Sequence, residues 1–147
     1  MSFSIDTAPG LAEQASRGDL NALLRLFLDI IYWIYPRPWV PVVSLADRKP
    51  EAGEILFDII LTFATDFPVN MEGSDGGCRV SPTTAAEFTL YKNFEAFGIA
   101  TIDTNGVASF VGGYIKFAIG DVFSFVAPAV QDASLEGFYF SFQGRRT

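Results

Sequence analysis

Turn signals recur roughly every dozen residues from residue 85 to the end of the chain, and this spacing constrains the fold most strongly. Asn105-Gly106, Gly120-Asp121 and residues 131–137 separate runs that are rich in Phe, Val, Ile and Tyr. Short apolar runs between closely spaced turns are typical of strands that pair antiparallel with their neighbours along the chain. The pattern therefore predicts an antiparallel meander.

The chain before the meander contains a helix-like segment and a strand-like segment. Residues 9–35 place apolar side chains on one broad helical face, and the proline-rich stretch "PRPWVPVV" that follows favours an extended path. Residues 54–67 alternate between apolar and polar side chains, which indicates one long strand. We expect a single domain over residues 1–147, with a helical segment at 9–35 and a β region at 52–145.

The strands of the β region are apolar on both faces, so one face does not simply meet water. A barrel with an apolar inside, a sandwich core and a dimer formed through one sheet face all account for this pattern. Gly112, Gly113 and a slip in the apolar phase at residues 97–98 favour curling, because glycines and bulges let strands bend sharply. The expected fold is mainly β, a small antiparallel β-barrel or strongly coiled sheet with an N-terminal helical segment.

Composition limits the partners. Half of the 147 residues are hydrophobic, and the 15 Phe either fill a core or line a cavity for an apolar molecule. A formal net charge of −7 disfavours nucleic acid as a partner. The single cysteine, Cys78, excludes an internal disulfide and fits the cytoplasm. The longest apolar run, residues 23–35, is shorter than the ~20 residues of a membrane span and contains two charges.

The chain has no histidine, which removes the histidine-dependent nucleophile systems and the usual zinc and iron sites. We therefore expect no metal and no cofactor. Acid–base work would fall to Asp, Glu, Tyr or Lys. Several such polar side chains interrupt apolar strand runs, namely Asp58, Tyr91, Lys92, Glu95, Tyr114, Lys116 and Tyr139.

Glu95 and Lys116 stand on either side of the Asn105-Gly106 turn. If that turn has two residues, Thr104 faces Val107, and Glu95 then faces Lys116 across the hairpin. The pair is then either an exposed ion pair that contributes little to stability or a charge pair inside the cavity that polarises a ligand. The candidate catalytic residues are Glu95, Lys116 and Tyr91.

Aromatic side chains are the candidates for lining a ligand cavity. The two tryptophans lie in the helical and extended segments, where they would cover the mouth of a barrel. The remaining candidates lie on strands of the meander. The candidate ligand-binding residues are Trp33, Trp39, Phe110, Tyr114, Phe125, Tyr139 and Phe140.

Two stretches resemble known families. "ASRGDLNALLRLFLDIIYW" resembles the opening of NTF2-like, SnoaL-type enzymes, although the usual pocket histidine is absent. A helical N-terminus followed by a Phe-rich meander with "TNGVASFVGGYIKF" is similar to small barrels of the allene-oxide-cyclase and dirigent type, which include spirotetronate cyclases. This second resemblance spans roughly residues 50 to 145. No catalytic motif matches residue by residue, so no family site is transferred.

Both resemblances imply an apolar cavity in a small curved sheet, where holding one conformer of the substrate does much of the work. They imply a cofactor-free cyclase or isomerase acting on a hydrophobic, polyketide-like molecule. The alternatives are a non-catalytic barrel that binds or carries a small hydrophobic ligand, and an interaction protein whose aromatic faces build an oligomer such as a homodimer.

Overall fold

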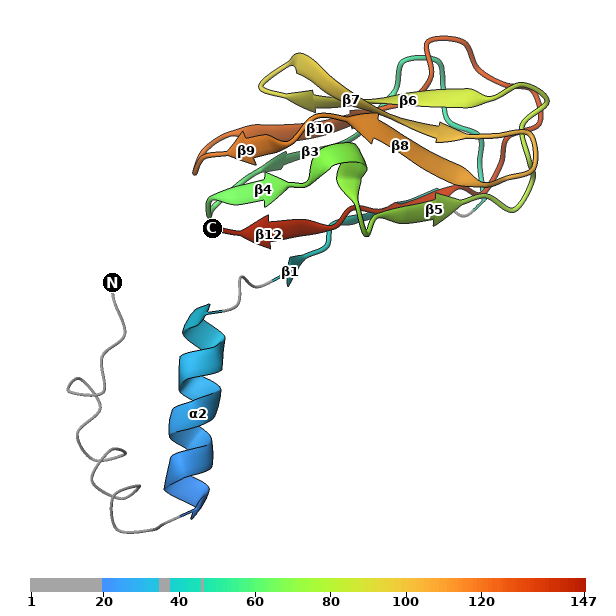
Figure 1. Ribbon diagram of the computed structural model, residues 1–147. Helices are drawn as coiled ribbons and strands as arrows, with labels where there is room; N and C mark the ends of the chain where they lie inside the picture. Colours follow the sequence, from blue (N-terminus) through green and yellow to red (C-terminus); the bar gives the residue numbers. More distant parts are fainter. Residues whose placement is uncertain (1–19, 35–37, 46) are drawn as a thin grey trace. The chain divides into compact units, whose positions relative to one another are not determined.

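The computed structural model describes residues 20–34, 38–45 and 47–147 (Figure 1). The chain divides into two units, Met1–Arg37 and Pro38–Thr147. In the first unit, helix α2 (Leu20–Ile34) confirms the expected helix over those residues, while residues 9–19 and 35 lie outside the described part. No helix among the described residues is both long and apolar enough to cross a membrane.

The second unit, called the β unit here, contains three antiparallel sheets. The five-stranded sheet has the order β3 (Ile55–Ile60), β10 (Val122–Val126), β6 (Ala86–Lys92), β7 (Glu95–Ile102), β8 (Ala108–Gly112). The four-stranded sheet has the order β1 (Pro38–Trp39), β12 (Gly144–Arg146), β4 (Thr65–Phe67), β9 (Ile115–Phe117). The three-stranded sheet has the order β2 (Val42–Ser44), β11 (Tyr139–Ser141), β5 (Asp75–Gly77). A short 3-10 helix, η2 (Val69–Met71), follows β4.

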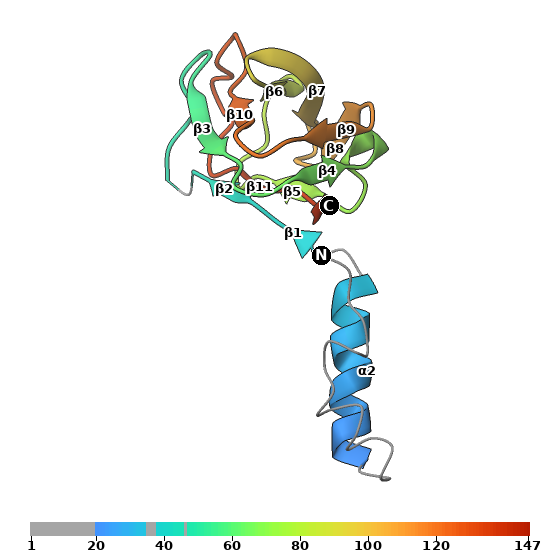
Figure 2. The same ribbon diagram turned by 90° about the vertical axis from the view of Figure 1, so that its left-hand side faces the viewer.

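The five-stranded sheet is strongly coiled. In Figure 2 its strands curve from β3 through β10, β6 and β7 to β8, and β2, β11 and β5 lie on the opposite side of the β unit. No sheet of the described strands closes into a barrel. The expected class, mainly β with a coiled antiparallel sheet and an N-terminal helix, is therefore confirmed without barrel closure.

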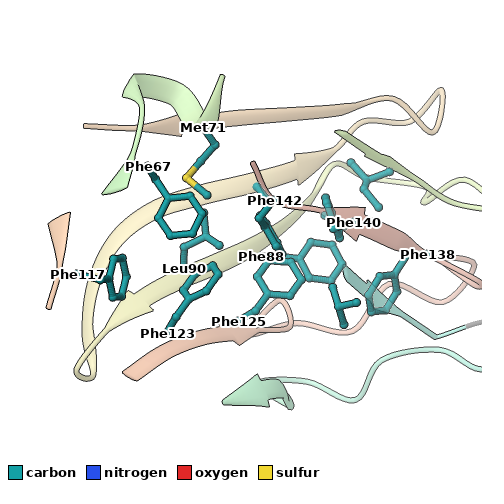
Figure 3. Close-up of a cluster of buried hydrophobic side chains, with 14 of the residues drawn as sticks. Phe67, Met71, Phe88, Leu90, Phe117, Phe123, Phe125, Phe138, Phe140 and Phe142 are labelled. Atoms are coloured by element: carbon teal, nitrogen blue, oxygen red, sulfur yellow. The ribbon is translucent and has the colours of Figure 1, made fainter. Parts of the chain in front are cut away.

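An aromatic core lies between the sheets (Figure 3). Phe88, Phe123 and Phe125 of the five-stranded sheet are fully buried. They meet rings from the other sheets, with centroids 5.1 Å apart for Phe88 and Phe140 and 5.2 Å apart for Phe67 and Phe123. Such ring pairs add about 0.5–1.5 kcal/mol each beyond the free energy of burial. The rings of the meander thus bind the sheets to one another.

The predicted long strand at 54–67 is wrong in one respect, because it is two strands in different sheets. β3 ends at Ile60, and β4 begins at Thr65. Between them the Leu61 N–H donates to the Asp121 carbonyl and the Leu61 carbonyl accepts from the Gly120 N–H. The alternation of apolar residues continues through the break because both strands face the same aromatic core.

The predicted bulge at residues 97–98 is confirmed, but the stretch 85–103 is a hairpin rather than one strand. Asn93 and Phe94 form its two-residue turn between β6 and β7, and both have positive φ, at 49° and 68°. Leu90 pairs with Gly98 and Tyr91 with Ala96, so Phe97 is the extra residue of the bulge.

The turn at Asn105-Gly106 exists, but its predicted register is off by one residue. The Gly106 N–H donates to the Asp103 carbonyl, and Asp103 Oδ1 accepts from the N–H groups of Asn105 and Val107. Only Gly106, at φ 82°, takes the left-handed conformation in this turn. The Asp103 side chain therefore holds a longer turn than the two-residue form, and Ile102 pairs with Ala108.

The predicted kink at Gly112-Gly113 marks the passage from one sheet to another. β8 ends at Gly112 in the five-stranded sheet, and β9 begins at Ile115 in the four-stranded sheet. Gly112 pairs with Gly98, and a Cβ on Gly112 would lie 3.1 Å from the Phe97 carbonyl oxygen. The two backbones thus approach closely just before the chain changes sheets.

Candidate functional site

A small, mainly apolar hollow lies on the outer face of the five-stranded sheet. It has a volume of about 110 Å³ and is lined by Ile55, Asp58, Tyr91, Phe94, Ser124 and Val126. These residues define the Ser124 hollow. They come from β3, β10, β6 and the β6–β7 turn, so the hollow exists only because these strands are neighbours in the sheet.

Ser124 lies at the centre of the hollow. It stands between Phe123 and Phe125, whose side chains enter the core, so period two along β10 turns its side chain to the outer face. Ser124 is only 4% exposed, and its Oγ has no hydrogen-bond partner in the described part of the chain. A buried hydroxyl without a partner costs about 1–3 kcal/mol. It is a buried polar group in the lining of the hollow that the described part of the chain leaves without a partner.

Asp58 and Tyr91 flank Ser124 on the two neighbouring strands. Ser124 pairs with Asp58 of β3 on one side and with Tyr91 of β6 on the other. Tyr91 is half-buried, whereas Asp58 is exposed, and no hydrogen bond or ion pair within the described residues involves the Asp58 carboxylate. A carboxylate, a hydroxyl and a phenol therefore form one row across three strands.

Phe94 borders the hollow in an unusual backbone conformation. Its φ is 68°, and its side chain is 78% exposed. A bulky residue in the left-handed region is strained by roughly 1–2 kcal/mol. Its neighbour Asn93 holds the turn, since Asn93 Nδ2 donates to Asp121 Oδ1 at 2.8 Å and Asn93 Oδ1 accepts from the Val122 N–H. The turn thus presents an aromatic ring to solvent beside the hollow.

The predicted pairing among the three candidate catalytic residues is not present. Glu95 is exposed at the start of β7 and pairs with Lys92, not with Lys116. Lys116 is exposed on β9 of the four-stranded sheet, where it pairs with Asp66. The expected pairing of Glu95 with Lys116 is wrong, because the register of the hairpin shifts by one residue and the chain changes sheets after Gly112. Only Tyr91 lines the hollow.

Four of the predicted ligand-binding aromatics pack into the core. Phe125 and Phe140 are fully buried, with ring centroids 5.1 Å apart. Phe110 is partly buried, 6.0 Å from Phe140, and Trp39 packs its ring 5.9 Å from Phe67. These rings contact other core rings. The high aromatic content of the chain is therefore explained by packing between the sheets.

The other three lie elsewhere. Tyr114 is exposed, and its Oη donates to Asp66 Oδ2 at 2.6 Å, a hydrogen bond that raises the pKa of Tyr114. Tyr139 is exposed on β11 and pairs with Gly77. Trp33 belongs to α2, and its side chain lies outside the described residues.

A larger and more polar groove lies where β6 begins, beside the loop that follows β10. It has a volume of about 500 Å³ and is lined in part by Thr83, Thr84, Glu87, Gln131 and Asp132. Asp132 Oδ2 accepts from the N–H and hydroxyl groups of Thr83, at 3.0 and 2.7 Å. These bonds, led by the Thr83 hydroxyl, hold the pKa of Asp132 far below its usual range. Asp132 is thus a structural clamp between two loops.

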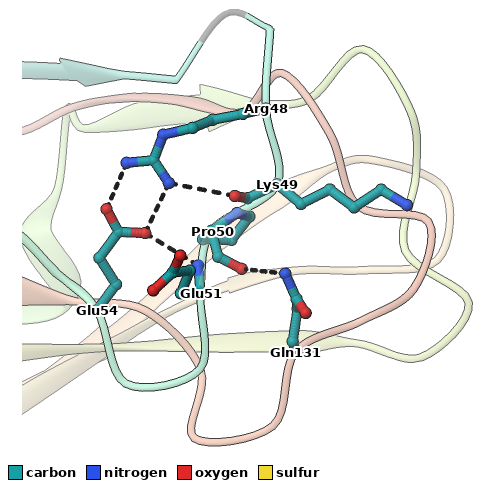
Figure 4. Close-up of polar contacts among 6 residues, drawn as sticks. All are labelled: Arg48, Lys49, Pro50, Glu51, Glu54 and Gln131. Atoms are coloured by element: carbon teal, nitrogen blue, oxygen red, sulfur yellow. Dashed lines mark hydrogen bonds and ion pairs between the residues drawn. The ribbon is translucent and has the colours of Figure 1, made fainter.

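The loop before β3 is fastened in a similar way (Figure 4). Arg48 forms a two-pronged ion pair with Glu54, whose Oε2 also accepts from the Glu51 N–H at 2.9 Å. The Arg48 guanidinium lowers the pKa of Glu54 to about 2. Gln131 Nε2 donates to the Pro50 carbonyl at 2.9 Å and joins this loop to the rim of the polar groove. Asp132 and Glu54 are therefore both engaged in holding loops.

The chain matches no protein-family model, and no curated protein matches it. Among the described residues, no group of three or more Asp, Glu or Cys side chains has the arrangement of a metal site. The structure alone therefore describes the class of protein. It is a curled antiparallel β unit with an aromatic core and a mainly apolar hollow on its outer face.

Sequence reasoning singled out Asp58 and Tyr91 as polar residues in apolar runs, but it missed Ser124 and Phe94. The signal for Ser124 was present in "VFSFV", where one hydroxyl interrupts an apolar strand. The signal for Phe94 was the asparagine before it, which readily enters a turn of positive φ.

Proposed function

We propose that the β unit is a non-catalytic binding module that takes a small apolar group, carrying one hydrogen-bonding atom, into the Ser124 hollow. The single observation that carries the proposal is the buried Ser124 hydroxyl, which lines an apolar hollow and has no partner in the described chain. An apolar ligand atom displaces poorly held water, and one polar ligand atom satisfies the hydroxyl.

The size of the hollow indicates how much of a ligand enters it. About 110 Å³ is less than the roughly 150 Å³ of an engineered protein cavity that holds benzene. A short alkyl chain or the end of a longer molecule therefore fits. The strained, exposed Phe94 supports the proposal, since backbone strain persists where it serves a site.

Binding is favoured over catalysis because two of the three candidate acid–base residues, Glu95 and Lys116, do not line the hollow. Glu95 lies opposite Lys92, and Lys116 lies on another sheet. Cyclisation or isomerisation of a polyketide-like substrate stays a prediction, and its test is turnover of such a substrate by the full chain.

The binding test is a titration of the ¹⁵N-labelled full chain with 1-butanol, followed by amide chemical shifts. We expect saturable shifts centred on Asp58, Tyr91 and Ser124. Ser124→Val removes the hydroxyl and adds a methyl group that narrows the hollow, so it should abolish these shifts. Ser109→Val is the matched control, because Ser109 is exposed on β8 of the same sheet and does not line the hollow. Shifts that persist in Ser124→Val would contradict the proposal.

A further inference from the structure

The lining of the Ser124 hollow selects among apolar ligands by charge. Asp58 brings a carboxylate that has no ion-pair or hydrogen-bond partner within the described residues. Tyr91 and Phe94 bring two aromatic rings to the lining. A carboxylate beside aromatic rings and an apolar hollow is the chemistry that recognises an organic cation.

Neighbouring cations do not neutralise this carboxylate. Lys92, next to Tyr91 on β6, holds its Nζ 3.1 Å from Asp121 Oδ2 and donates to the Lys116 carbonyl at 2.6 Å. Arg48, near β3 in the sequence, is paired with Glu54. Asp58 is therefore left to attract a cation from outside, and the formal net charge of −7 supports the same preference.

From these contacts we propose that the hollow binds an alkylammonium group, with the alkyl stem in the hollow and the ammonium beside Asp58. The inference rests on the proposed function and adds the ligand class. The stem contacts Ile55 and Val126, and the ammonium stays at the mouth of the hollow, where it donates to the carboxylate of the exposed Asp58. Faces of Tyr91 and Phe94 add cation–π attraction. A neutral ligand of equal size gains only the first of these contributions in full.

The experiment compares three probes of matched size at pH 7 on the full chain: n-butylammonium, 1-butanol and butanoate. Dissociation constants come from the amide shifts of Asp58, Tyr91 and Ser124. We expect n-butylammonium to bind about tenfold more tightly than 1-butanol, and butanoate to bind most weakly. The preference for the cation should shrink as salt is raised, because Asp58 is exposed.

Two variants test whether Asp58 causes the preference for the cation over 1-butanol. Asp58→Asn should bring the ratio of the two dissociation constants close to one. Glu72→Gln removes the same charge from an exposed position outside the hollow and should keep the ratio. An unchanged ratio in Asp58→Asn would overturn the inference.

The outcomes separate the inference from the proposed function. Equal binding of n-butylammonium and 1-butanol at the hollow would overturn the alkylammonium inference and leave the binding module intact. Saturable shifts with none of the three probes would overturn both. A fourth probe, Nα-acetyl-lysine methylamide, identifies the source of the ammonium. If it binds as tightly as n-butylammonium, the ligand is a lysine side chain of a partner protein. If it binds more weakly, the ligand is a free amine.

Discussion

Phe94 combines a strained backbone with an exposed apolar ring, and the proposed binding at the hollow that it borders gives both features a purpose. Its left-handed backbone suits Asn or Gly in a two-residue hairpin turn, whereas a Phe there is strained. The ring is 78% exposed, so burial of the ring does not offset the strain. If the ring forms part of the site, its contacts with a bound ligand offset the strain.

Phe94→Gly is therefore expected to stabilise the protein by about 1–2 kcal/mol while it weakens binding of n-butylammonium. Glycine relieves the positive φ, and the aromatic wall is lost. Denaturant unfolding and the amide titration give the two values. Phe94→Ala is the control, since it removes the ring but keeps the strain, so it should weaken binding without raising stability. A stability loss in Phe94→Gly would show that the ring is packed.

Asp132 shows how one carboxylate makes stability depend on pH. Its folded pKa lies below the value of about 3.9 expected in the unfolded chain, because the Thr83 hydroxyl and the Ser134 N–H donate to the carboxylate. The unfolded state therefore binds the proton more tightly. The stabilisation is complete above about pH 5 and is lost progressively as the pH falls below the unfolded pKa toward the folded pKa.

The expected result is that the thermal midpoint of the wild type falls more steeply between about pH 5 and pH 2 than that of Asp132→Asn. Asparagine does not titrate, so the variant lacks this contribution at every pH. Circular dichroism melts at stepped pH values measure both curves. Other carboxylates with lowered pKa, such as Glu54, titrate in both proteins and cancel in the difference. Parallel curves would contradict the assignment to Asp132.

The hairpin between β7 and β8 depends on Gly106 more than on the other glycine that follows it, Gly113. Gly106 has φ 82°, and a Cβ there would lie 3.0 Å from the Ser81 Oγ and 3.3 Å from the Cys78 Sγ. Gly113, in the passage to β9, has no positive φ, and nothing lies within 4 Å of an added Cβ. The two glycines thus form a matched pair for substitution.

Gly106→Ala should lower the free energy of unfolding by about 1–2 kcal/mol, because alanine is strained at positive φ and its methyl crowds Ser81. Gly113→Ala should change it by at most about 0.5 kcal/mol. Guanidinium unfolding of the two variants checks the contrast. Equal effects would mean that the turn adapts to the added methyl group.

The same elements show what the sequence could predict. Turn positions could be predicted, because the backbone preferences of Gly, Asn and Pro favour turns. The register of the β7–β8 hairpin was not, because the Asp103 side chain decides it through two backbone N–H groups. The break after Ile60 was hidden, since both halves of the predicted strand bury residues in one core.

The candidate site depends on the whole molecule. Asp58 and Tyr91 were recognisable one at a time, but their meeting at Ser124 requires β10 to insert between β3 and β6. That strand order is non-sequential, and local patterns carry little information about it. Composition likewise predicted many aromatic rings in a core or a cavity. The packing of the sheets on one another places most of these rings in the core. In the described part, eight of the 15 Phe are at most 2% exposed.

The core and the Ser124 hollow both lie within Pro38–Thr147, so a chain that begins at Pro38 is expected to fold cooperatively and to retain n-butylammonium binding. Trp39 makes the starting point critical, because its ring packs 5.8 Å from Phe63 and 6.3 Å from Phe123. A chain that begins at Pro41 loses this ring and should unfold at lower denaturant.

Trp39 is the single tryptophan of the Pro38 fragment, so its fluorescence reports unfolding directly. Amide spectra of the fragment and of the full chain should overlay at Asp58, Tyr91 and Ser124. Poor amide dispersion in the fragment would show that residues 1–37 are needed to fold the sheets. A folded fragment that no longer binds would contradict the prediction, because the hollow contains none of residues 1–37.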